Sequence, residues 1–379
     1  MAQTTIENLR DFGQSIWLDN ISCSLIASGK LKALLAQGLS GVTSNPTIFD
    51  KAISQSKDYD ETIAQLHRKG KSVFEVYDDL TISDVQAATD IFRPLYEKTN
   101  KLDGYVSLEI NPKLARQTQD TVEEGKRLWK KVNRPNLMLK VPATEEGFGA
   151  IEALLAQGMN VNATLIFSLE QYIKTAQAFL KGMRRLADKG ARLSDTHSVA
   201  SVFVSRTDTA IDASIEQLIK NAPNQEEAVR LQSLRGKAAV SNCGLIYGKF
   251  LEIYQSPEWK QLEDKGASLQ RIVWASTSSK NPRYSDIKYV SELISQNTVN
   301  TVPDTTLEAF LDHGIVKEAL TKNITPAAEV IRELKALTID INEVCAKLLN
   351  DGVIAFEKSF DSLLASIEEK AKAQSAMAV

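Results

Sequence analysis

The chain has 379 residues, a length that fits about two to three average domains or one large α/β barrel. Its 45 Lys and Arg residues and 48 Asp and Glu residues give a formal net charge of −3, which argues against a nucleic acid or an anionic membrane as the main partner. Apolar residues make up 43% and charged residues 25%, so the composition is that of a globular protein rather than of a disordered chain.

Eight short β-rich runs alternate with longer stretches of helical periodicity, as expected of parallel βα units. The β-rich runs are 15–21, 41–45, 105–110, 137–143, 160–167, 198–206, 271–277 and 298–303. The clearest helical patterns between them are 24–37, 113–132, 145–157, 169–187 and 286–295. Because eight parallel strands close a barrel, we predict an α/β fold of the (β/α)8 TIM-barrel type. A doubly wound sheet is the rival fold, but no GxGxxG or GxxxxGK[ST] motif follows any run.

Two connections, 46–104 and 207–270, are too long for simple βα loops and are helical in pattern. We interpret them as helical insertions within a single barrel domain that spans 1–379. After the eighth run, 304–379 is helical throughout, and we expect this C-terminal extension to pack on the outside of the barrel.

The three cysteines, Cys23, Cys243 and Cys345, lie far apart and form no CxxC pair, which argues against a disulfide framework and a zinc site and favours a reducing cytoplasm. None of the three histidines stands in a metal-ligand spacing. No run of about 18 apolar residues predicts a membrane span, and the first ten residues lack the apolar core of a secretory signal. We therefore expect a cytoplasmic protein that works without a metal, a cofactor or a membrane.

In a TIM barrel, the loops at the carboxyl ends of the strands form the mouth where chemistry takes place. We therefore looked in each run for polar residues among apolar neighbours. The candidates on the first seven runs are Asp19, Asn45, Glu109, Lys140, Asn162, Thr164, Ser201, Arg206 and Ser276.

Lys140 is the most informative candidate, because it lies within the apolar run LMLKVPA. Side chains alternate along a strand, which places this amine on one face among apolar neighbours. Burial disfavours an ammonium ion, and a neutral amine is a nucleophile. Two structural interpretations stay open, an exposed strand edge and a static salt bridge with Asp19 or Glu109.

The remaining polar candidates also allow two interpretations each. Asp19 and Glu109 stand late in apolar strands, where a buried acid needs either an ion-pair partner or a proton-transfer task. The amides of Asn45 and Asn162 can donate and accept hydrogen bonds and so can bind a polyol, although Asn45 precedes a proline and could simply stabilise a turn.

Four residues could hold a phosphate at the mouth: Arg206, Ser276, Ser278 and Lys280. Taken singly, each of them is also compatible with an ordinary surface charge or turn residue.

Several of these segments resemble the transaldolases, the class I aldolase-type barrel enzymes of the pentose phosphate pathway. GVTSNPTIF at 41–49 is similar to their first signature, and LMLKVPAT at 137–144 is similar to the segment that holds their Schiff-base lysine. Three further segments follow in the family's order, NVNATLIFS at 160–168, SVFVSR at 201–206 and WASTSSKNP at 274–282. The resemblance is closest to the longer bacterial branch.

The resemblance implies a role for each matching residue. Lys140 would form the Schiff base, Asp19 would be the acid/base of the carbon–carbon step, and Glu109 would work through a water held near Thr164. The residues that would bind the dihydroxyacetone part are Asn45, Asn162 and Ser201.

The phosphate side matches the family less completely. Arg206 and Ser276 match family residues, but Ser278 stands where many members have a second arginine. Lys280 is the candidate replacement, as a point charge rather than a bidentate fork.

The implied activity is transfer of a dihydroxyacetone unit between sugar phosphates through a lysine Schiff base. The donors would be sedoheptulose 7-phosphate or fructose 6-phosphate, and the acceptors glyceraldehyde 3-phosphate or erythrose 4-phosphate. Three alternatives stay open: an aldolase that releases free dihydroxyacetone, a decarboxylating or dehydrating Schiff-base enzyme, and a non-catalytic sugar-phosphate sensor. Whether the protein is a monomer or a homodimer also stays open.

Overall fold

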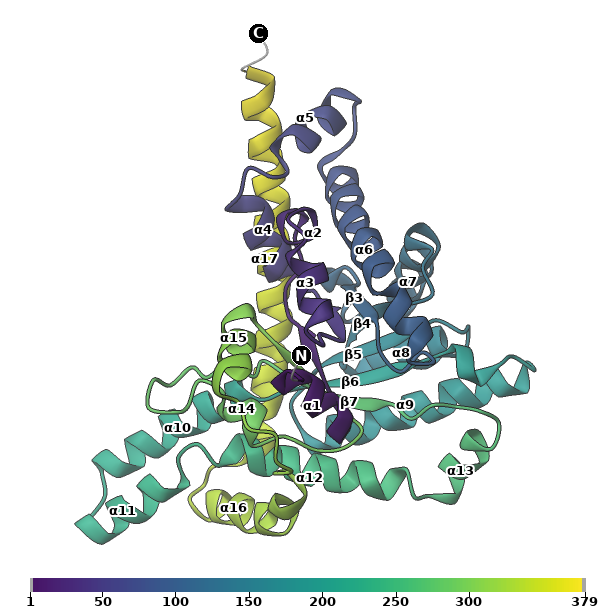
Figure 1. The fold of residues 1–379 in the computed structure, drawn as a ribbon. Helices are drawn as coiled ribbons and strands as arrows, with labels where there is room; N and C mark the ends of the chain where they lie inside the picture. Colours follow the sequence, from purple (N-terminus) through teal and green to yellow (C-terminus); the bar gives the residue numbers. More distant parts are fainter. Residues whose placement is uncertain (1–2, 377–379) are drawn as a thin grey trace.

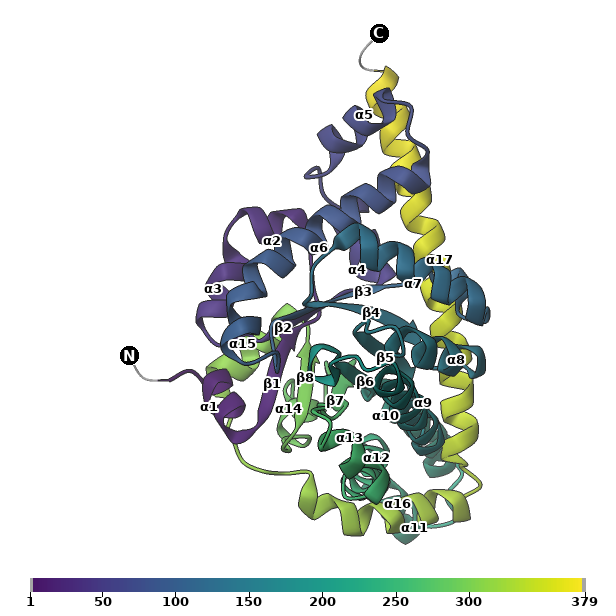
Figure 2. The ribbon, with the colours of Figure 1, turned by 90° about the vertical axis from the view of Figure 1, so that its right-hand side faces the viewer.

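The computed structural model describes residues 3–376, with side chains from 3 to 373 (Figure 1), and within that range eight parallel strands, all labelled in Figure 2, form one closed barrel in chain order. The strands are β1 (Gln14–Leu18), β2 (Gly41–Thr43), β3 (Tyr105–Glu109), β4 (Leu137–Pro142), β5 (Val161–Ile166), β6 (Ser198–Phe203), β7 (Arg271–Ala275) and β8 (Thr298–Val302). Each strand pairs with the next, and β8 pairs with β1. The predicted (β/α)8 barrel is confirmed.

Every residue of these strands is buried, because helices cover the outside of the barrel and side chains fill its interior. The amino-terminal end of the barrel is closed. There, Arg271 forms a buried ion pair with Asp103 at 3.0 Å, and Ser15 donates a hydrogen bond to the same carboxylate. The open end is therefore the carboxyl end of the strands.

The helices between the strands follow the predicted patterns with three differences. Those that precede or follow the first six strands are α1 (Thr5–Phe12), α2 (Cys23–Ala27), α3 (Lys30–Ala36), α7 (Thr118–Val132), α8 (Glu145–Leu155) and α9 (Leu169–Asp188). The helix expected at 24–37 is broken by Gly29, whose φ of +77° is left-handed. The helix expected from 113 starts with a separate 3-10 turn at Pro112–Leu114. Of the helix expected at 286–295, only α14 (Lys288–Ser291) is helical.

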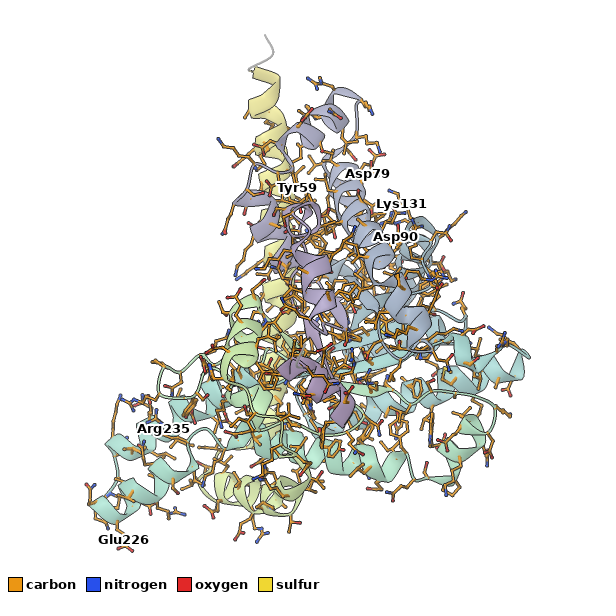
Figure 3. All side chains as sticks on the ribbon, in the orientation of Figure 1. Tyr59, Asp79, Asp90, Lys131, Glu226 and Arg235 are labelled. Carbon is orange, nitrogen blue, oxygen red and sulfur yellow. The ribbon has the colours of Figure 1, made fainter. Side chains whose placement is uncertain are left out.

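Both long connections consist of helices. The first contains α4 (Pro46–Ser54), α5 (Asp60–Arg68) and α6 (Val73–Lys98), and the second contains α10 (Ser205–Lys220), α11 (Gln225–Leu234), α12 (Ala238–Ile253) and α13 (Pro257–Glu263). Ion pairs fasten α6 to α7: Asp78 accepts two hydrogen bonds from Arg127 at 2.8 Å, and Lys131 lies 3.1 Å from Asp79 (Figure 3). The division into one domain with insertions stays a prediction.

The C-terminal extension forms α15 (Asp304–His313), α16 (Ile324–Ala336) and the long α17 (Ile341–Ala376). Figures 1 and 2 show α17 as one extended yellow helix beside α4 and α5, both of which it contacts. The expectation that the extension packs on the outside of the barrel is incomplete, because α17 also reaches the mouth. Its Gly352 lies against the Leu165 side chain of β5, and Cys345 donates a 3.2 Å hydrogen bond to the carbonyl of Phe167.

The contact with α17 depends on an irregularity in β5. The register between β5 and β6 shifts between Ala163 and Ile166, and Leu165 has a left-handed φ of +58°. Leu165 is fully buried in a second apolar cluster that also contains Phe203 and Phe356. The bulge therefore turns one residue of the barrel wall toward the C-terminal helix.

Candidate active site

A cavity of about 290 Å³ opens at the carboxyl end of the barrel. It brings together seven of the ten residues that the sequence predicts for the site: Asp19, Asn45, Lys140, Ser201, Arg206, Ser276 and Lys280. The other three, Glu109, Asn162 and Thr164, are buried and do not line this cavity in the described structure.

Lys140 lies at the centre of this arrangement, on β4. Only 4% of it is exposed, so the interpretation as an exposed strand edge is wrong. Its Nζ donates a hydrogen bond to the carbonyl oxygen of Ser44 at 3.2 Å and lies 3.4 Å from Oε2 of Glu109. The ring centroid of Phe356 is 5.9 Å from the same nitrogen. The ion pair with Glu109 exists, and it also gives the amine a partner for proton transfer.

The strand register explains why these groups meet. Glu109, Lys140 and Asn162 are Cα partners across the neighbouring strands β3, β4 and β5. Paired residues on parallel strands point to the same face, so all three side chains enter the same layer of the barrel interior.

Glu109 is a carboxyl group whose proton is easily gained and lost near neutral pH. Burial raises its pKa to about 7, an effect that the positive charge of Lys140 partly offsets. Neither of its oxygens has a hydrogen-bond partner among the described residues beyond the ion pair, and the hydroxyl oxygen of Thr164 is likewise buried and unpartnered there. The carboxylate oxygens of Glu109 and the hydroxyl of Thr164 can therefore form further hydrogen bonds with a bound molecule.

Asp19 directly follows β1 and lines the same cavity as Lys140. Burial raises the pKa of Asp19, while the charge of Lys140 and a hydrogen bond from Thr43 lower it. The Thr43 hydroxyl donates to Oδ1 of Asp19 at 2.8 Å and lies 2.6 Å from the hydroxyl of Thr301. This hydroxyl pair holds the carboxylate at the cavity wall.

The amide candidates form two different arrangements. Ser201 donates to Oδ1 of Asn162 at 2.7 Å, and Nδ2 of Asn162 donates to Ser107 at 3.0 Å, which fixes the orientation of the buried amide. Asn45 caps α4 by accepting a hydrogen bond from the backbone nitrogen of Ile48 at 3.1 Å. Asn45 can therefore cap the helix and also serve the cavity, because the cap uses only the amide oxygen and leaves the amide nitrogen available.

The cations of the cavity lie at its rim. Arg206 is in the first turn of α10, has no ion-pair partner among the described residues, and has its pKa lowered by burial. Lys280 donates a 2.6 Å hydrogen bond to the Ser278 hydroxyl. The pKa of Lys280 is lowered by burial and then by the positive charges of Arg206 and Lys51. Cations that repel one another in this way favour binding of an anion.

Comparisons with known proteins identify the family. The family model described as Transaldolase/Fructose-6-phosphate aldolase matches residues 16–367. A protein of Trichodesmium erythraeum named Transaldolase is 44% identical over 97% of each chain. One of Nostoc sp. named Transaldolase 2 is 42% identical over 98% of this chain and 99% of its own, and one of Saccharopolyspora erythraea named Transaldolase is 44% identical over 97% and 98%.

This chain belongs to the transaldolase/fructose-6-phosphate aldolase family. The resemblance noted in its sequence is thereby confirmed. No helix within residues 3–376 is long and apolar enough to cross a membrane. The described residues also contain no group of three or more His, Cys, Asp or Glu side chains that could hold a metal ion.

Sequence reasoning missed several residues of this candidate site, two of which bear on its chemistry. Lys51 of α4 and Phe356 of α17 both line the cavity. Lys51 lies two residues beyond the recognised segment 41–49 and four residues after Thr47, a helical spacing that places both on one face of α4. Phe356 had no such signal, because an aromatic residue in an amphipathic helix is usually a core residue.

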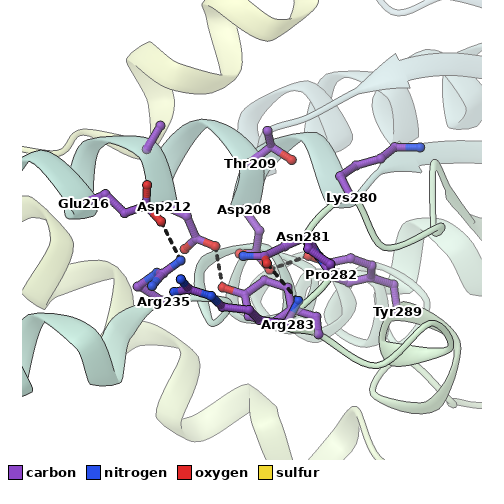
Figure 4. A pocket seen from close by; sticks show the side chains of 12 residues that line it. Asp208, Thr209, Asp212, Glu216, Arg235, Lys280, Asn281, Pro282, Arg283 and Tyr289 are labelled. Atoms are coloured by element: carbon purple, nitrogen blue, oxygen red, sulfur yellow. Dashed lines mark hydrogen bonds and ion pairs between the residues drawn. The ribbon is translucent and has the colours of Figure 1, made fainter.

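A second cavity, of about 350 Å³, lies beside the mouth, and Lys280 lines both (Figure 4). Two aspartates that line this second cavity accept hydrogen bonds from tyrosines of the protein. The Tyr284 hydroxyl donates to Asp212 at 2.5 Å, and the Tyr289 hydroxyl donates to Asp208 at 2.8 Å. Because backbone nitrogens also donate to both carboxylates, these contacts anchor the loop after β7 that carries Lys280.

Proposed function

We propose that this protein is a transaldolase that carries a dihydroxyacetone unit on Lys140 between two sugar phosphates. The donor is sedoheptulose 7-phosphate or fructose 6-phosphate, and the acceptor is glyceraldehyde 3-phosphate or erythrose 4-phosphate, as in the non-oxidative pentose phosphate pathway. One observation carries the proposal: a 4% exposed amine lies 3.4 Å from a carboxyl group, in a cavity that also contains Asp19 and unpaired cations.

The first step forms the Schiff base. The neutral amine of Lys140 attacks the C2 ketone of the donor, and the resulting carbinolamine loses its hydroxyl as water to give an iminium ion. Glu109 supplies the proton for that water, which its pKa of about 7 supports. The unpartnered oxygens of Glu109 and Thr164 fit a water held between them as the proton carrier.

The second step breaks the C3–C4 bond. Asp19 removes the proton from the C4 hydroxyl, the bond electrons move into the iminium, and the first aldose phosphate leaves while an enamine stays on the lysine. The Thr43 hydrogen bond at 2.8 Å orients Asp19 for this transfer.

The last steps reverse the first ones with a new partner. C3 of the enamine attacks the aldehyde of the acceptor, and Asp19 returns its proton to the new C4 oxygen. Water then adds to the iminium with Glu109 as the base, and the new ketose phosphate leaves Lys140. The amides of Asn45 and Asn162 and the Ser201 hydroxyl bind the dihydroxyacetone hydroxyls.

The remaining proposed groups bind the phosphate. Arg206, in the first turn of α10, lines the cavity together with Ser276 and Lys280 of the loop that follows β7. The position of Arg206 and Lys280 at the rim suits a substrate whose phosphate points outward and whose ketone points toward Lys140.

Borohydride trapping tests the proposal. Fructose 6-phosphate with borohydride should add a covalent mass to the peptide that contains Lys140, and a Lys140→Met variant should stay unmodified. Product formation should require an acceptor such as erythrose 4-phosphate. Free dihydroxyacetone formed at the same rate without acceptor would make the protein an aldolase, and binding without trapping would make it a sensor.

We further propose that the protein works in the cytoplasm on sugar phosphates alone, without a metal or cofactor. Its three cysteines are all unpaired, and Cys243 and Cys345 are buried, which suits a reducing compartment. Sedimentation velocity distinguishes a monomer from a homodimer.

A further inference from the structure

The cavity contains a third cation that no part of the proposed function uses. Lys51 lines it together with Arg206 and Lys280, and the three residues come from α4, α10 and the loop after β7. None of the three has an ion-pair partner among the described residues, and all three line the same cavity. Three cations that converge on one cavity without being ion-paired favour the binding of an anionic ligand.

The charges of the trio interact with one another. Both Arg206 and Lys51 lower the pKa of Lys280, and only Asp19 acts on it in the opposite direction. Asp50, the neighbour of Lys51 in the chain, interacts with it but also accepts a hydrogen bond from Ser362 at 3.2 Å. The excess of positive charge at the rim matches a phosphate dianion, which can compensate two or three cations at once.

The first turn of the helix that carries Lys51 is held in place by two contacts. Asn45 caps its first turn, and Thr47, which also lines the cavity, lies 2.8 Å from the Ser359 hydroxyl of α17. Ile48 and Lys51 follow on the same side of α4, while Phe49 and Ile53 are buried. Lys51 also lines a neighbouring groove with Asp19, so its flexible side chain lies at the rim and can swing over a bound phosphate.

We infer that Lys51 is a phosphate-binding residue that, with Lys280, takes the place of the arginine absent at Ser278. The Ser278 hydroxyl is uncharged, and it accepts a hydrogen bond from Lys280. Two lysines, one on α4 and one on the loop after β7, then provide two separate point charges in place of one bidentate guanidinium. The inference depends on the proposed function for the identity of the sugar but not for the binding of phosphate itself.

The test compares Lys51→Met and Lys51→Arg with Lys57→Met, an exposed lysine that does not line the cavity. Titration calorimetry with inorganic phosphate should show a roughly tenfold weaker Kd for Lys51→Met, the usual loss for a charged hydrogen bond. Lys51→Arg and Lys57→Met should stay within about twofold of the unchanged protein.

Kinetics give the second readout. In Lys51→Met, the KM for fructose 6-phosphate and for erythrose 4-phosphate should each rise roughly tenfold while kcat changes by less than about twofold. Trapping of dihydroxyacetone, which carries no phosphate, should be unaffected. Unchanged phosphate Kd and unchanged KM in Lys51→Met would overturn the inference. Failure of trapping in the unchanged protein would instead overturn the proposed function and would leave the phosphate titration valid.

Discussion

Oε2 of Glu109 lies 3.4 Å from Nζ of Lys140, and the two residues are Cα partners on adjacent strands. This pairing gives the buried amine a carboxyl neighbour whose pKa is about 7. A group with that pKa is about half protonated at neutral pH, so it can give a proton when water leaves and take one when water returns.

Glu109→Gln should therefore impair imine formation more than substrate binding. We expect kcat to fall roughly 10²- to 10⁴-fold, and we expect the inflection near pH 7 in the kcat profile to disappear. Rapid-quench trapping in a single turnover measures the step directly. An unchanged rate of imine formation in this variant would remove the role of Glu109.

Asp19→Asn should separate imine formation from bond cleavage. Because Asn45, Lys140 and Glu109 are untouched, fructose 6-phosphate should still be trapped on the lysine by borohydride. Release of glyceraldehyde 3-phosphate should fall roughly 10²- to 10⁴-fold, the usual loss for a positioned general base. Thr43→Val, which removes the 2.8 Å hydrogen bond to Asp19, should give a smaller loss of the same kind. Full cleavage activity in Asp19→Asn would contradict this assignment.

Phe356 should keep water away from the enamine. Its ring centroid is 5.9 Å from Nζ of Lys140, and it is 3% exposed. In Phe356→Leu we expect a larger fraction of turnovers to end in protonation of the enamine and release of free dihydroxyacetone. The measurement is the ratio of dihydroxyacetone to transfer product at saturating acceptor. Ile354→Ala, on the exposed side of α17, is the control and should leave the ratio unchanged. The same ratio in both variants would argue against a water-excluding role.

Asp84 should make the folded protein less stable as the pH rises. It is 7% exposed on α6, and burial raises its pKa from 3.8 to about 6, an effect that a hydrogen bond from Tyr59 partly offsets. The folded-state pKa lies above the unfolded one, so the stabilisation is complete below about pH 4 and is lost as the pH rises through 6. Two pKa units correspond to about 3 kcal/mol.

The Asp84→Asn variant tests this sign. At pH 8 it should be more stable than the unchanged protein by up to about 3 kcal/mol, and the difference should vanish near pH 4. Denaturant unfolding at several pH values measures it. Asp90→Asn, on the same helix, is the opposite control, because Arg134 lowers the pKa of Asp90 (Figure 3). A stability difference that does not change with pH would contradict the assignment.

Much of the barrel was predictable because its strands are buried on both faces and therefore appear as compact apolar runs. Lys140 stood out for the same reason, as a charged residue inside such a run. Breaks within helices were harder to predict, since Gly29 interrupts an otherwise continuous helical pattern with a single left-handed residue.

The contribution of α17 could not be predicted, because it depends on contacts between segments far apart in the chain. Phe356 meets the mouth only because the bulge at Leu165 and the small Gly352 let α17 approach β5. Lys51 resembled any exposed lysine until α4 placed it beside Arg206 and Lys280. Local patterns specify strands and helices, whereas these positions are set by packing.

The shared register of Glu109, Lys140 and Asn162 limits which changes in length the chain tolerates. Deleting one residue ahead of any of these positions within its strand would turn that side chain outward into the helical layer and bring an aliphatic neighbour inside. Length variation is then compatible with this chemistry only in the connections between strands.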